Sequence, residues 1–271
     1  MIARRNLLVA ALVLTAGPAL ALDPGTASGH YARDGVKLTF SHAIALSQDN
    51  TEGLLDNGPQ VRVVLSDVEV PVAALYGAVF PPVNGMARKD AVHGVMLEFS
   101  PKDPKAMHVT VLSRPQELGA SLTNISLSNS QGVFKKIVVT ATRVTGEYDD
   151  GGEGGDMKFS FSAPVFTDPV QADLRGPDAQ KSPQVQALIA RAEAIGRGDL
   201  PAALALSSQG SDLRGVPAGE LKQFKAAVPE MLKGIRAIKR VVVRRETAVA
   251  LMGDGGFSSL VLEGGAWKVA D

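Results

Sequence analysis

The alternation of apolar and polar side chains is most regular at residues 36–46. Apart from His42, every even-numbered residue in this stretch is large and apolar, and the odd-numbered residues are polar or small. Because successive side chains of a β-strand point to opposite faces, a period of two predicts one long strand with a single buried face. The strands that follow in the chain are expected to cover that face.

Short apolar runs separated by glycine, proline and aspartate continue to about residue 166. This spacing predicts an antiparallel β-sandwich or barrel in the first part of the chain. Pro101, Asp103 and Pro104 predict a hairpin turn between two of its strands. The strands are expected at 61–65, 91–99, 106–112, 133–145 and 157–161, with a short helix at 71–76 that ends before Pro81 and Pro82.

A polar stretch without periodicity follows at residues 167–181, and it predicts a linker. Ser182 and Pro183 then predict a helix start, since serine caps the first turn and proline fits its first position. The residues beyond favour an α+β domain in which helices precede a short antiparallel meander. Three helices are expected at about 183–195, 200–206 and 221–232, and four strands at 238–244, 247–252, 257–262 and 266–269.

The first 21 residues have the order of a secretory signal peptide. Arg4 and Arg5 form a positive head, an apolar run follows at residues 7–14, and small residues stand at Ala19 and Ala21. The run is too short to cross about 30 Å of hydrocarbon, so we expect cleavage after Ala21 and no transmembrane anchor. The sequence therefore predicts a periplasmic or secreted bacterial protein with a signal peptide at 1–21, a β domain at 22–166, a linker at 167–181 and an α+β domain at 182–271.

The charge balance and composition exclude several classes of function. The chain has 28 basic and 28 acidic residues and a formal net charge of zero, whereas nucleic-acid binding needs a basic surplus. Aromatic residues make up only 5% of the chain, which argues against a stacking platform for bases or sugars. Because the chain has no cysteine, disulfides, thiol catalysis and cysteine-bound metals are excluded.

Two histidines are candidate functional residues in the β domain. By strand parity His42 points with Leu38 and Phe40, and His93 points with the apolar residues of its own strand, so both are expected to face the core. Neutral imidazole suits zinc or copper, and Asp67 or Glu98 could add a further ligand. The alternative is a pair of buried histidines that bond to backbone carbonyls.

The stretch from Tyr148 to Asp156 is rich in glycine and acid. Residues 151–156 fit the calcium-binding half of a glycine-rich nonapeptide repeat, and Asp149, Asp150 and Asp156 could supply the hard oxygen ligands that calcium prefers. Only one copy of the repeat is present. The alternative is a solvated hairpin tip, which glycine and aspartate also favour.

One group of cations stands near the end of the third expected helix. Arg236, Lys239, Arg240, Arg244 and Arg245 could dock an anionic lipid, a cell-wall polymer or an acidic partner. The alternative is a solvated face in which the cations complement the negative end of the helix dipole.

The C-terminal part of the chain resembles a known superfamily. A helix ending in Gly198-Asp199-Leu200, then Thr247 to Ala250, then a final Trp267-Lys268-Val269, is similar to the nuclear transport factor two-like (cystatin-like) superfamily. The resemblance implies a curved sheet wrapped around a long helix over residues 182–271. Enzymatic members of that superfamily use histidine, aspartate or tyrosine inside the cone, and this segment has no histidine or tyrosine.

The familiar enzyme motifs are missing from the sequence. It contains no nucleophile elbow, phosphate-binding glycine loop, zinc-protease helix or dinucleotide fingerprint. We therefore expect a binding or scaffolding module that uses no catalysis and no cofactor, with an envelope protein or a small ligand as its partner. Two alternatives stay open: an envelope hydrolase or isomerase with its site in the interdomain cleft and His42 or His93 as base, and a metal-handling periplasmic protein.

Overall fold

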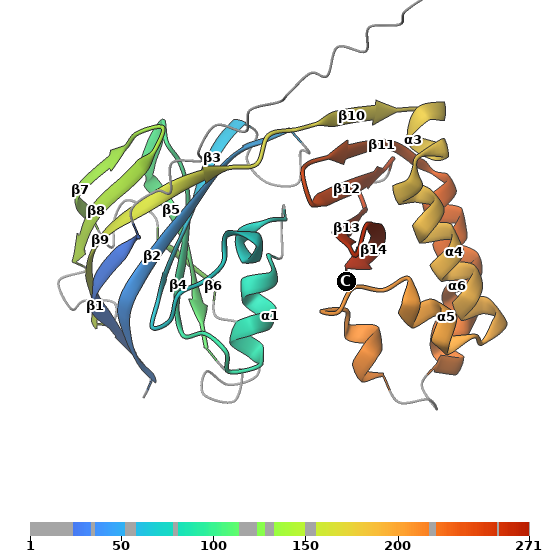
Figure 1. Ribbon diagram of the computed structural model, residues 1–271, viewed down its shortest axis with the longest axis horizontal. Helices are drawn as coiled ribbons and strands as arrows, with labels where there is room; N and C mark the ends of the chain where they lie inside the picture. The colour runs from blue at the N-terminus through green and yellow to red at the C-terminus, as the bar shows by residue number, and fades with distance from the viewer. Residues whose placement is uncertain are drawn as a thin grey trace, which may run out of the picture.

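The computed structural model describes residues 24–33, 36–51, 58–77, 81–113, 124–127, 133–149, 156–216, 221–253 and 255–270. The signal peptide expected at 1–21 lies outside these residues. The described chain is mostly antiparallel β-structure, with one large curved sheet, one smaller sheet and a few helices (Figure 1).

The large sheet has nine strands in the order β6-β5-β4-β3-β2-β1-β9-β8-β7. It curls into a nearly closed, barrel-like shape, and β5, the second strand in this order, contacts β7, the last. The barrel prediction is therefore closer than the sandwich, because a single sheet supplies all nine strands. Their bounds are β1 Thr26–Arg33, β2 Val36–Asn50, β3 Gly58–Ser66, β4 Gly94–Ser100, β5 Asp103–Leu112, β6 Asn124–Leu127, β7 Val133–Val139, β8 Arg143–Asp149 and β9 Asp156–Thr167.

Strand β1 lies between β2 and β9 and is antiparallel to both. Gly29 makes the close approach to β9 possible: its φ is 134°, and a Cβ atom there would lie 2.1 Å from the carbonyl oxygen of Lys158. Beyond the start of β1, β2 pairs directly with β9 in parallel, from Ala45 opposite Val165 to Ser47 opposite Thr167. The long strand predicted at 36–46 is thus present and longer than expected.

The exchange of partner strands interrupts the alternation that predicted β2. Phe40 and Ala43, three residues apart, belong to the same apolar cluster, while Ile44 packs in a different cluster. A register irregularity between β1 and β2 falls at the same place, ending at the pair Thr26–His42. The prediction that Ile44 shares a face with Leu38 and Phe40 is therefore wrong, and His42 is only half-buried.

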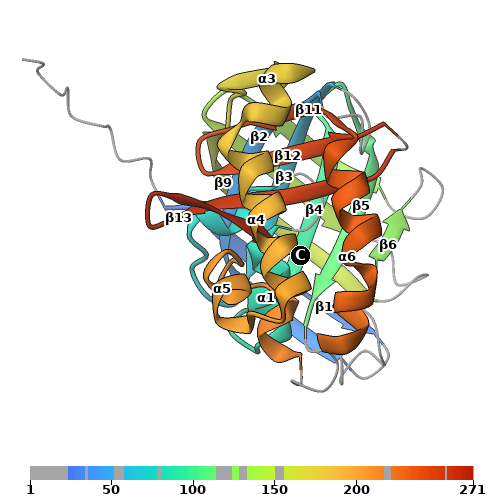
Figure 2. The ribbon, with the colours of Figure 1, turned by 90° about the vertical axis from the view of Figure 1, so that its right-hand side faces the viewer.

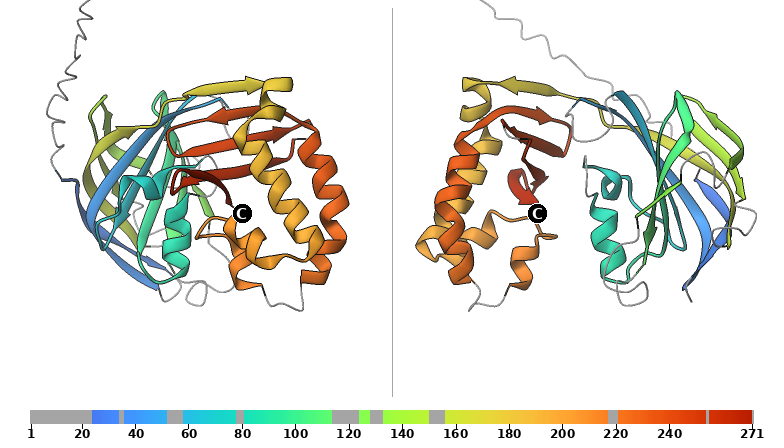
Figure 3. Two further views of the ribbon diagram at one scale, coloured as in Figure 1. Left: turned by 45° about the vertical axis from the view of Figure 1, so that its right-hand side comes forward. Right: turned by 180° about the vertical axis from the view of Figure 1, so that it is seen from behind.

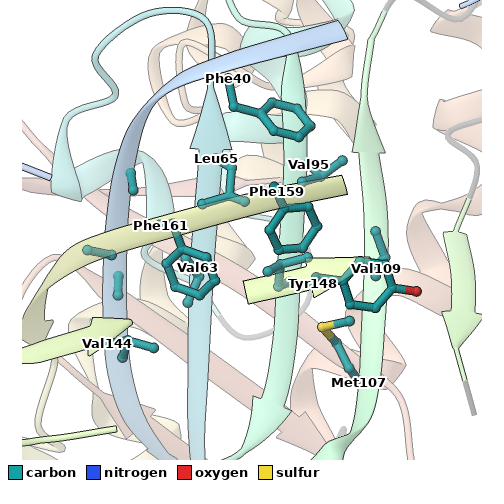
Figure 4. Packing of buried hydrophobic residues seen from close by; sticks show 14 of the residues in the cluster. Phe40, Val63, Leu65, Val95, Met107, Val109, Val144, Tyr148, Phe159 and Phe161 are labelled. Carbon is teal, nitrogen blue, oxygen red and sulfur yellow. The ribbon is translucent and has the colours of Figure 1, made fainter. Parts of the chain in front are cut away.

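The inside of the curved sheet is filled by an aromatic core (Figure 4). Phe159 is at its centre and stacks on Tyr148, with ring centroids 5.1 Å apart and planes at 14°. Phe40 and Phe134 meet Phe159 edge-on at 6.1 and 6.4 Å. Valines and leucines of β3, β4 and β5 complete the cluster, so burial of apolar area is what holds the sheet in its curve.

A second apolar cluster lies on the outer face of the sheet, under the 3₁₀ helix η1 (Val72–Leu75) and helix α1 (Pro82–Arg88). Arg62 of β3 holds η1 against the sheet. Its Nη1 donates to the carbonyl oxygens of Leu75 and Gly77, the latter at 2.8 Å, and its Nη2 pairs with Glu98 at 2.7 Å. The short helix expected at 71–76 is confirmed in its shorter, 3₁₀ form. Helix α1 was not predicted.

The small sheet has five strands in the order β10-β11-β12-β13-β14, and two long helices, α4 and α6, cover one of its faces (Figure 2). Ser182 caps α4 by accepting a hydrogen bond from the backbone of Val185, and Gly198 ends it in the left-handed conformation. The expected helices and meander are confirmed. The elements are β10 Ala172–Arg175, α3 Pro177–Lys181, α4 Pro183–Arg197, α5 Leu200–Ala205, η2 Asp212–Gly215, α6 Leu221–Arg236, β11 Ile238–Val243, β12 Thr247–Met252, β13 Phe257–Glu263 and β14 Ala266–Ala270.

The segment 167–181, expected to be an irregular linker, is mostly regular structure. It contains β10, which pairs with β11 and adds a fifth strand to the meander, and helix α3. Strand β10 runs across from the large sheet to the small one (Figure 3). Its four residues are too few to show the alternation of apolar and polar side chains that predicts a strand, so the sequence pattern predicts a linker here. None of the helices in the described residues has the length and apolar content that a membrane crossing requires.

Candidate functional site

His93, one of the two candidate histidines, lies just before β4 and not inside the core. Its Nδ1 is 2.9 Å from Asp67 Oδ2, and its Nε2 is 2.8 Å from Asp90 Oδ1. Its backbone N–H also donates to Asp67 Oδ1 at 2.9 Å, and the N–H of Asp67 donates to the His93 carbonyl at 3.0 Å. The histidine therefore joins the end of β3 to the turn that leads into β4.

Both ring nitrogens of His93 are bonded to carboxylates, and this decides what the ring can do. A ring nitrogen that is hydrogen-bonded to a carboxylate is not available to take a proton from a substrate. Burial opposes the ionisation of Asp67, but the backbone N–H and the imidazole of His93 outweigh it and hold the pKa of that carboxyl below its usual value. The geometry fits a structural hydrogen-bonded cluster better than a general base.

Replacing Asp67 with asparagine tests this role. The variant should lose about 1 kcal/mol of unfolding free energy at pH 7, since it weakens charge-assisted hydrogen bonds. Because the pKa of Asp67 is lowered by folding, the difference from wild type should be complete above the ordinary carboxyl pKa and disappear as the pH falls through the lowered one. Urea unfolding at pH 7, 5 and 3 measures it. The exposed Glu69→Gln is the control, and a pH-independent loss would contradict the assignment.

The other candidate metal ligands are not brought together. His42 lies on β2 opposite Ser66, and His93 is held by its two aspartates. The prediction that both face the core is wrong for His93, because β4 begins at Gly94 and His93 lies in the turn before it. Among the residues that the structure describes, no group of three or more histidine, aspartate or glutamate side chains has the geometry to hold a metal ion.

The glycine-rich acidic stretch lies mostly outside the described residues, and this includes Asp150 and residues 151–155. Asp156 begins β9, but its side chain is not among those described. Asp149 ends β8, and its Oδ2 pairs with Lys135 at 2.7 Å and Lys158 at 3.4 Å. Strands β8 and β9 pair as a hairpin with this stretch between them, which both the calcium-site and the solvated-tip interpretations require. The calcium hypothesis stays a prediction.

Arg240 and Arg244, two of the five candidate cations, bond through their side chains to other parts of the same chain, where the two sheets meet. Arg244 is buried (4% exposed), and it donates to the carbonyl oxygens of Asp168 at 2.6 Å and Asp49 at 2.7 Å. Arg240 pairs with Asp173 at 2.7 Å and donates to the carbonyl of Thr51 at 2.6 Å. We call the region formed by Arg240, Arg244 and their partners Asp49, Thr51, Asp168 and Asp173 the seam. A buried guanidinium such as Arg244 is not accessible to an anionic partner.

The seam contains a buried acid. Asp168 is 1% exposed, and its Oδ1 accepts a hydrogen bond from the backbone of Arg245 at 3.3 Å. Burial raises the pKa of Asp168, although Arg245 and Arg244 favour the charged form. Burial and the nearby Asp168 charge likewise raise the pKa of Tyr76, which follows η1. Arg236, Lys239 and Arg245, by contrast, are exposed, and their role as anion-docking cations stays a prediction.

A cavity of about 330 Å³ lies between the helix layer and the small sheet. Its walls come from α4, α6 and strands β12, β13 and β14, and most of its lining side chains are apolar. The apolar residues that shape it include Leu188, Ala192, Met231, Ile235, Met252 and Phe257. We call this cavity the helix–sheet pocket. Its size and its mainly apolar walls are those of a small-molecule site.

The helix–sheet pocket has three polar residues in its lining, Arg191, Ser258 and Ser259. Arg191 was missed in the sequence, where the stripe of α4 was recognised only from its apolar members. The signal was present, however: Arg191 is three residues after Leu188 and four before Ile195, which is the spacing of the buried face. A charged residue at such a position is unusual enough to mark a site.

Two other hollows, of about 400 and 390 Å³, adjoin each other on the large sheet. Both include Ser28, Glu147 and Ser160, which are exposed polar residues of β1, β8 and β9. Such a surface offers a ligand little apolar area to bury, so the helix–sheet pocket is the better candidate site.

Comparison with known proteins does not assign the chain to a family. No protein-family model matches it, and the searches of curated proteins and of solved structures found no match either. The proposal for function therefore depends on the residues and geometry described above.

Proposed function

We propose that this chain is an exported binding protein of the bacterial envelope that holds a small apolar ligand in the helix–sheet pocket and catalyses no reaction. The observation that carries the proposal is the pocket itself, an apolar cavity of about 330 Å³ between two packed layers. Several of its lining residues, including Met231, Met252 and Phe257, are only half-buried, so a ligand can enter from solvent and cover their apolar surface. The two-domain organisation, with residues 22–166 and 182–271 as separate bodies, is part of this proposal.

The size of the pocket limits the ligand. At roughly 30 Å³ for each water-sized group, 330 Å³ holds roughly ten non-hydrogen atoms. Met231 and Met252 line it, and methionine side chains adapt to ligands of different shape. A linear or monocyclic apolar molecule therefore fits better than a nucleotide or a flavin.

Binding is favoured over the two alternative functions. A hydrolase or isomerase would need His93 or His42 as a base, but both nitrogens of His93 are engaged by Asp67 and Asp90. A metal-handling role would need ligands that converge on one point. His42 lies on β2 opposite Ser66, whereas His93 is held by Asp67 and Asp90. Neither alternative gains support from a specific contact.

Titration with 1-octanol, an uncharged probe of about the right size, tests the proposal. Calorimetry with the mature chain should show one site with a dissociation constant below about 1 mM, which corresponds to about −4 kcal/mol. Ser258→Leu, which places a larger side chain in the pocket wall, should weaken binding at least tenfold. Ser160→Leu, on the exposed face of β9, is the matched control and should bind as wild type does. If 1-octanol fails to bind, or binds Ser258→Leu equally well, the proposal is wrong.

A further inference from the structure

Asp168 is a buried acid at the seam, directly after the end of β9. Its side chain is 1% exposed. Its backbone N–H donates to the carbonyl oxygen of Ser47 on β2 at 3.3 Å, and its Oδ1 accepts a hydrogen bond from the backbone N–H of Arg245 at 3.3 Å. The carboxyl group therefore lies where the large sheet meets the turn between β11 and β12 of the small sheet.

The second carboxyl oxygen of Asp168 lacks a donor. Oδ2 is buried, and among the residues that the structure describes none forms a hydrogen bond with it. The Nη1 and Nη2 of Arg244 donate to the backbone carbonyl oxygens of Asp168 and Asp49. An ionised carboxylate that loses its water needs hydrogen-bond donors in exchange, and the seam leaves Oδ2 without one. The closed seam thus favours the neutral form of this carboxyl.

The charged and titratable groups around Asp168 do not offset its burial. Burial raises the pKa of the Asp168 carboxyl, and Arg245 and Arg244 lower it by less. Glu246, in the same turn as Arg245, adds to the rise. Burial also raises the pKa of Tyr76, which follows η1, so the phenol stays uncharged while a carboxyl titrates. Asp168 is therefore the group at the seam whose charge responds to a moderate change of pH.

We propose that Asp168 makes the seam sensitive to pH: the seam stays closed while this carboxyl carries its proton and opens more often once the proton is lost. Opening lets water reach Oδ2, and hydration benefits the ionised carboxyl far more than the neutral one. The proposal concerns the contact between the two sheets and does not depend on a ligand in the helix–sheet pocket.

The direction of the pH dependence follows from linkage. The pKa of Asp168 is higher in the closed seam than in an open, hydrated one, so closing the seam takes up a proton. The contribution of Asp168 to closure is complete below the ordinary pKa of an aspartate, and it is lost as the pH rises through the raised pKa. Between these two pKa values the opening equilibrium constant should increase by up to about tenfold for each pH unit.

Amide hydrogen exchange of Arg245 measures the opening of the seam, because this N–H donates to Asp168 Oδ1. The mature chain is studied by NMR from pH 4 to pH 7.5, with exchange rates corrected for their intrinsic dependence on pH. The opening constant should rise by at least about threefold across this range and then level off above the raised pKa. An opening constant that stays flat or falls as the pH rises would overturn the proposal.

Two variants assign the response to the buried carboxyl. Asp168→Asn keeps the shape but cannot ionise, so the opening constant should no longer change with pH. Both chains contain the same four histidines, so the difference between them excludes histidine titration. Asp49→Asn is the matched control: it removes an exposed carboxyl and keeps the carbonyl that bonds Arg244. A folded Asp168→Asn chain with the wild-type pH dependence, or an Asp49→Asn chain without it, would overturn the role of Asp168.

A measurement on the wild-type chain covers the case in which Asp168→Asn does not fold. In a chain labelled with ¹³C at the aspartate carboxyls, NMR follows the ionisation of Asp168 directly, and its resonance is assigned through the nearby N–H of Arg245. Its midpoint should lie above the ordinary value for aspartate and coincide with the pH at which the opening constant levels off. If Asp168 titrates at or below the ordinary value, the closed seam does not favour the neutral carboxyl, and the proposal is wrong.

Discussion

Replacing Phe159 with alanine should lower the free energy of unfolding by about 3–5 kcal/mol. Phe159 is 3% exposed and lies at the centre of the aromatic core of the large sheet (Figure 4). Its ring stacks on Tyr148 and meets Phe40 and Phe134 edge-on. The substitution removes a ring from between these groups and leaves a cavity that a curved sheet cannot close. Since a typical domain is stable by about 5–15 kcal/mol, the loss is a large share of the total.

Urea unfolding followed by circular dichroism measures this effect, with two controls. Phe159→Leu fills most of the space and should lose only about 1.5 kcal/mol. Val138→Ala, at an exposed position on β7, should change stability by less than about 0.5 kcal/mol. If Phe159→Ala behaves like Val138→Ala, the aromatic core is not what stabilises the sheet.

Replacing Arg244 with methionine should destabilise the seam by about 3 kcal/mol. The guanidinium is buried and donates to the carbonyl oxygens of Asp168 and Asp49. Methionine fills part of the same volume but leaves both carbonyls without this donor, and each such loss costs about 1–3 kcal/mol. Because the seam joins the two sheets, we also expect calorimetric unfolding to separate into two transitions.

The matched control is Arg236→Met, the same substitution at an exposed residue at the end of α6. It should leave both the stability and the shape of the transition unchanged. Two transitions in Arg244→Met would support two bodies that fold separately. A single transition with an unchanged midpoint would show that the seam does not couple the sheets through Arg244.

Local chemistry explains most of what the sequence could predict. The helix start at Ser182, the helix end at Gly198 and the cap at Asp199 each depend on residues close in sequence. The same is true of the C-terminal meander, whose strands pair with their neighbours in the chain. Helix α1 was missed because Pro82 was read as a stop, whereas proline also occupies the first turn of a helix.

The remaining features depend on contacts between distant residues. Arg244 bonds to Asp49, 195 residues away, so a cation that seemed available to a partner is buried at the seam. The face of His42 depends on where β2 exchanges β1 for β9 as its partner. Arg191 could be found by helical spacing, but only the fold shows that a pocket lies beside it. Pairings of this kind depend on tertiary structure, which no local pattern contains.

Methionine methyl NMR tests the central claim, that the helix–sheet pocket binds a small apolar molecule, most directly. The chain has seven methionines. Met231 and Met252 line the pocket, and Met107 and Met157 lie in the core of the large sheet. In a ¹³C-methyl-methionine sample titrated with 1-octanol, the resonances of Met231 and Met252 should shift together and saturate, while those of Met107 and Met157 stay fixed. Shifts confined to Met107 and Met157, or no saturable shift at any methionine, would contradict the account.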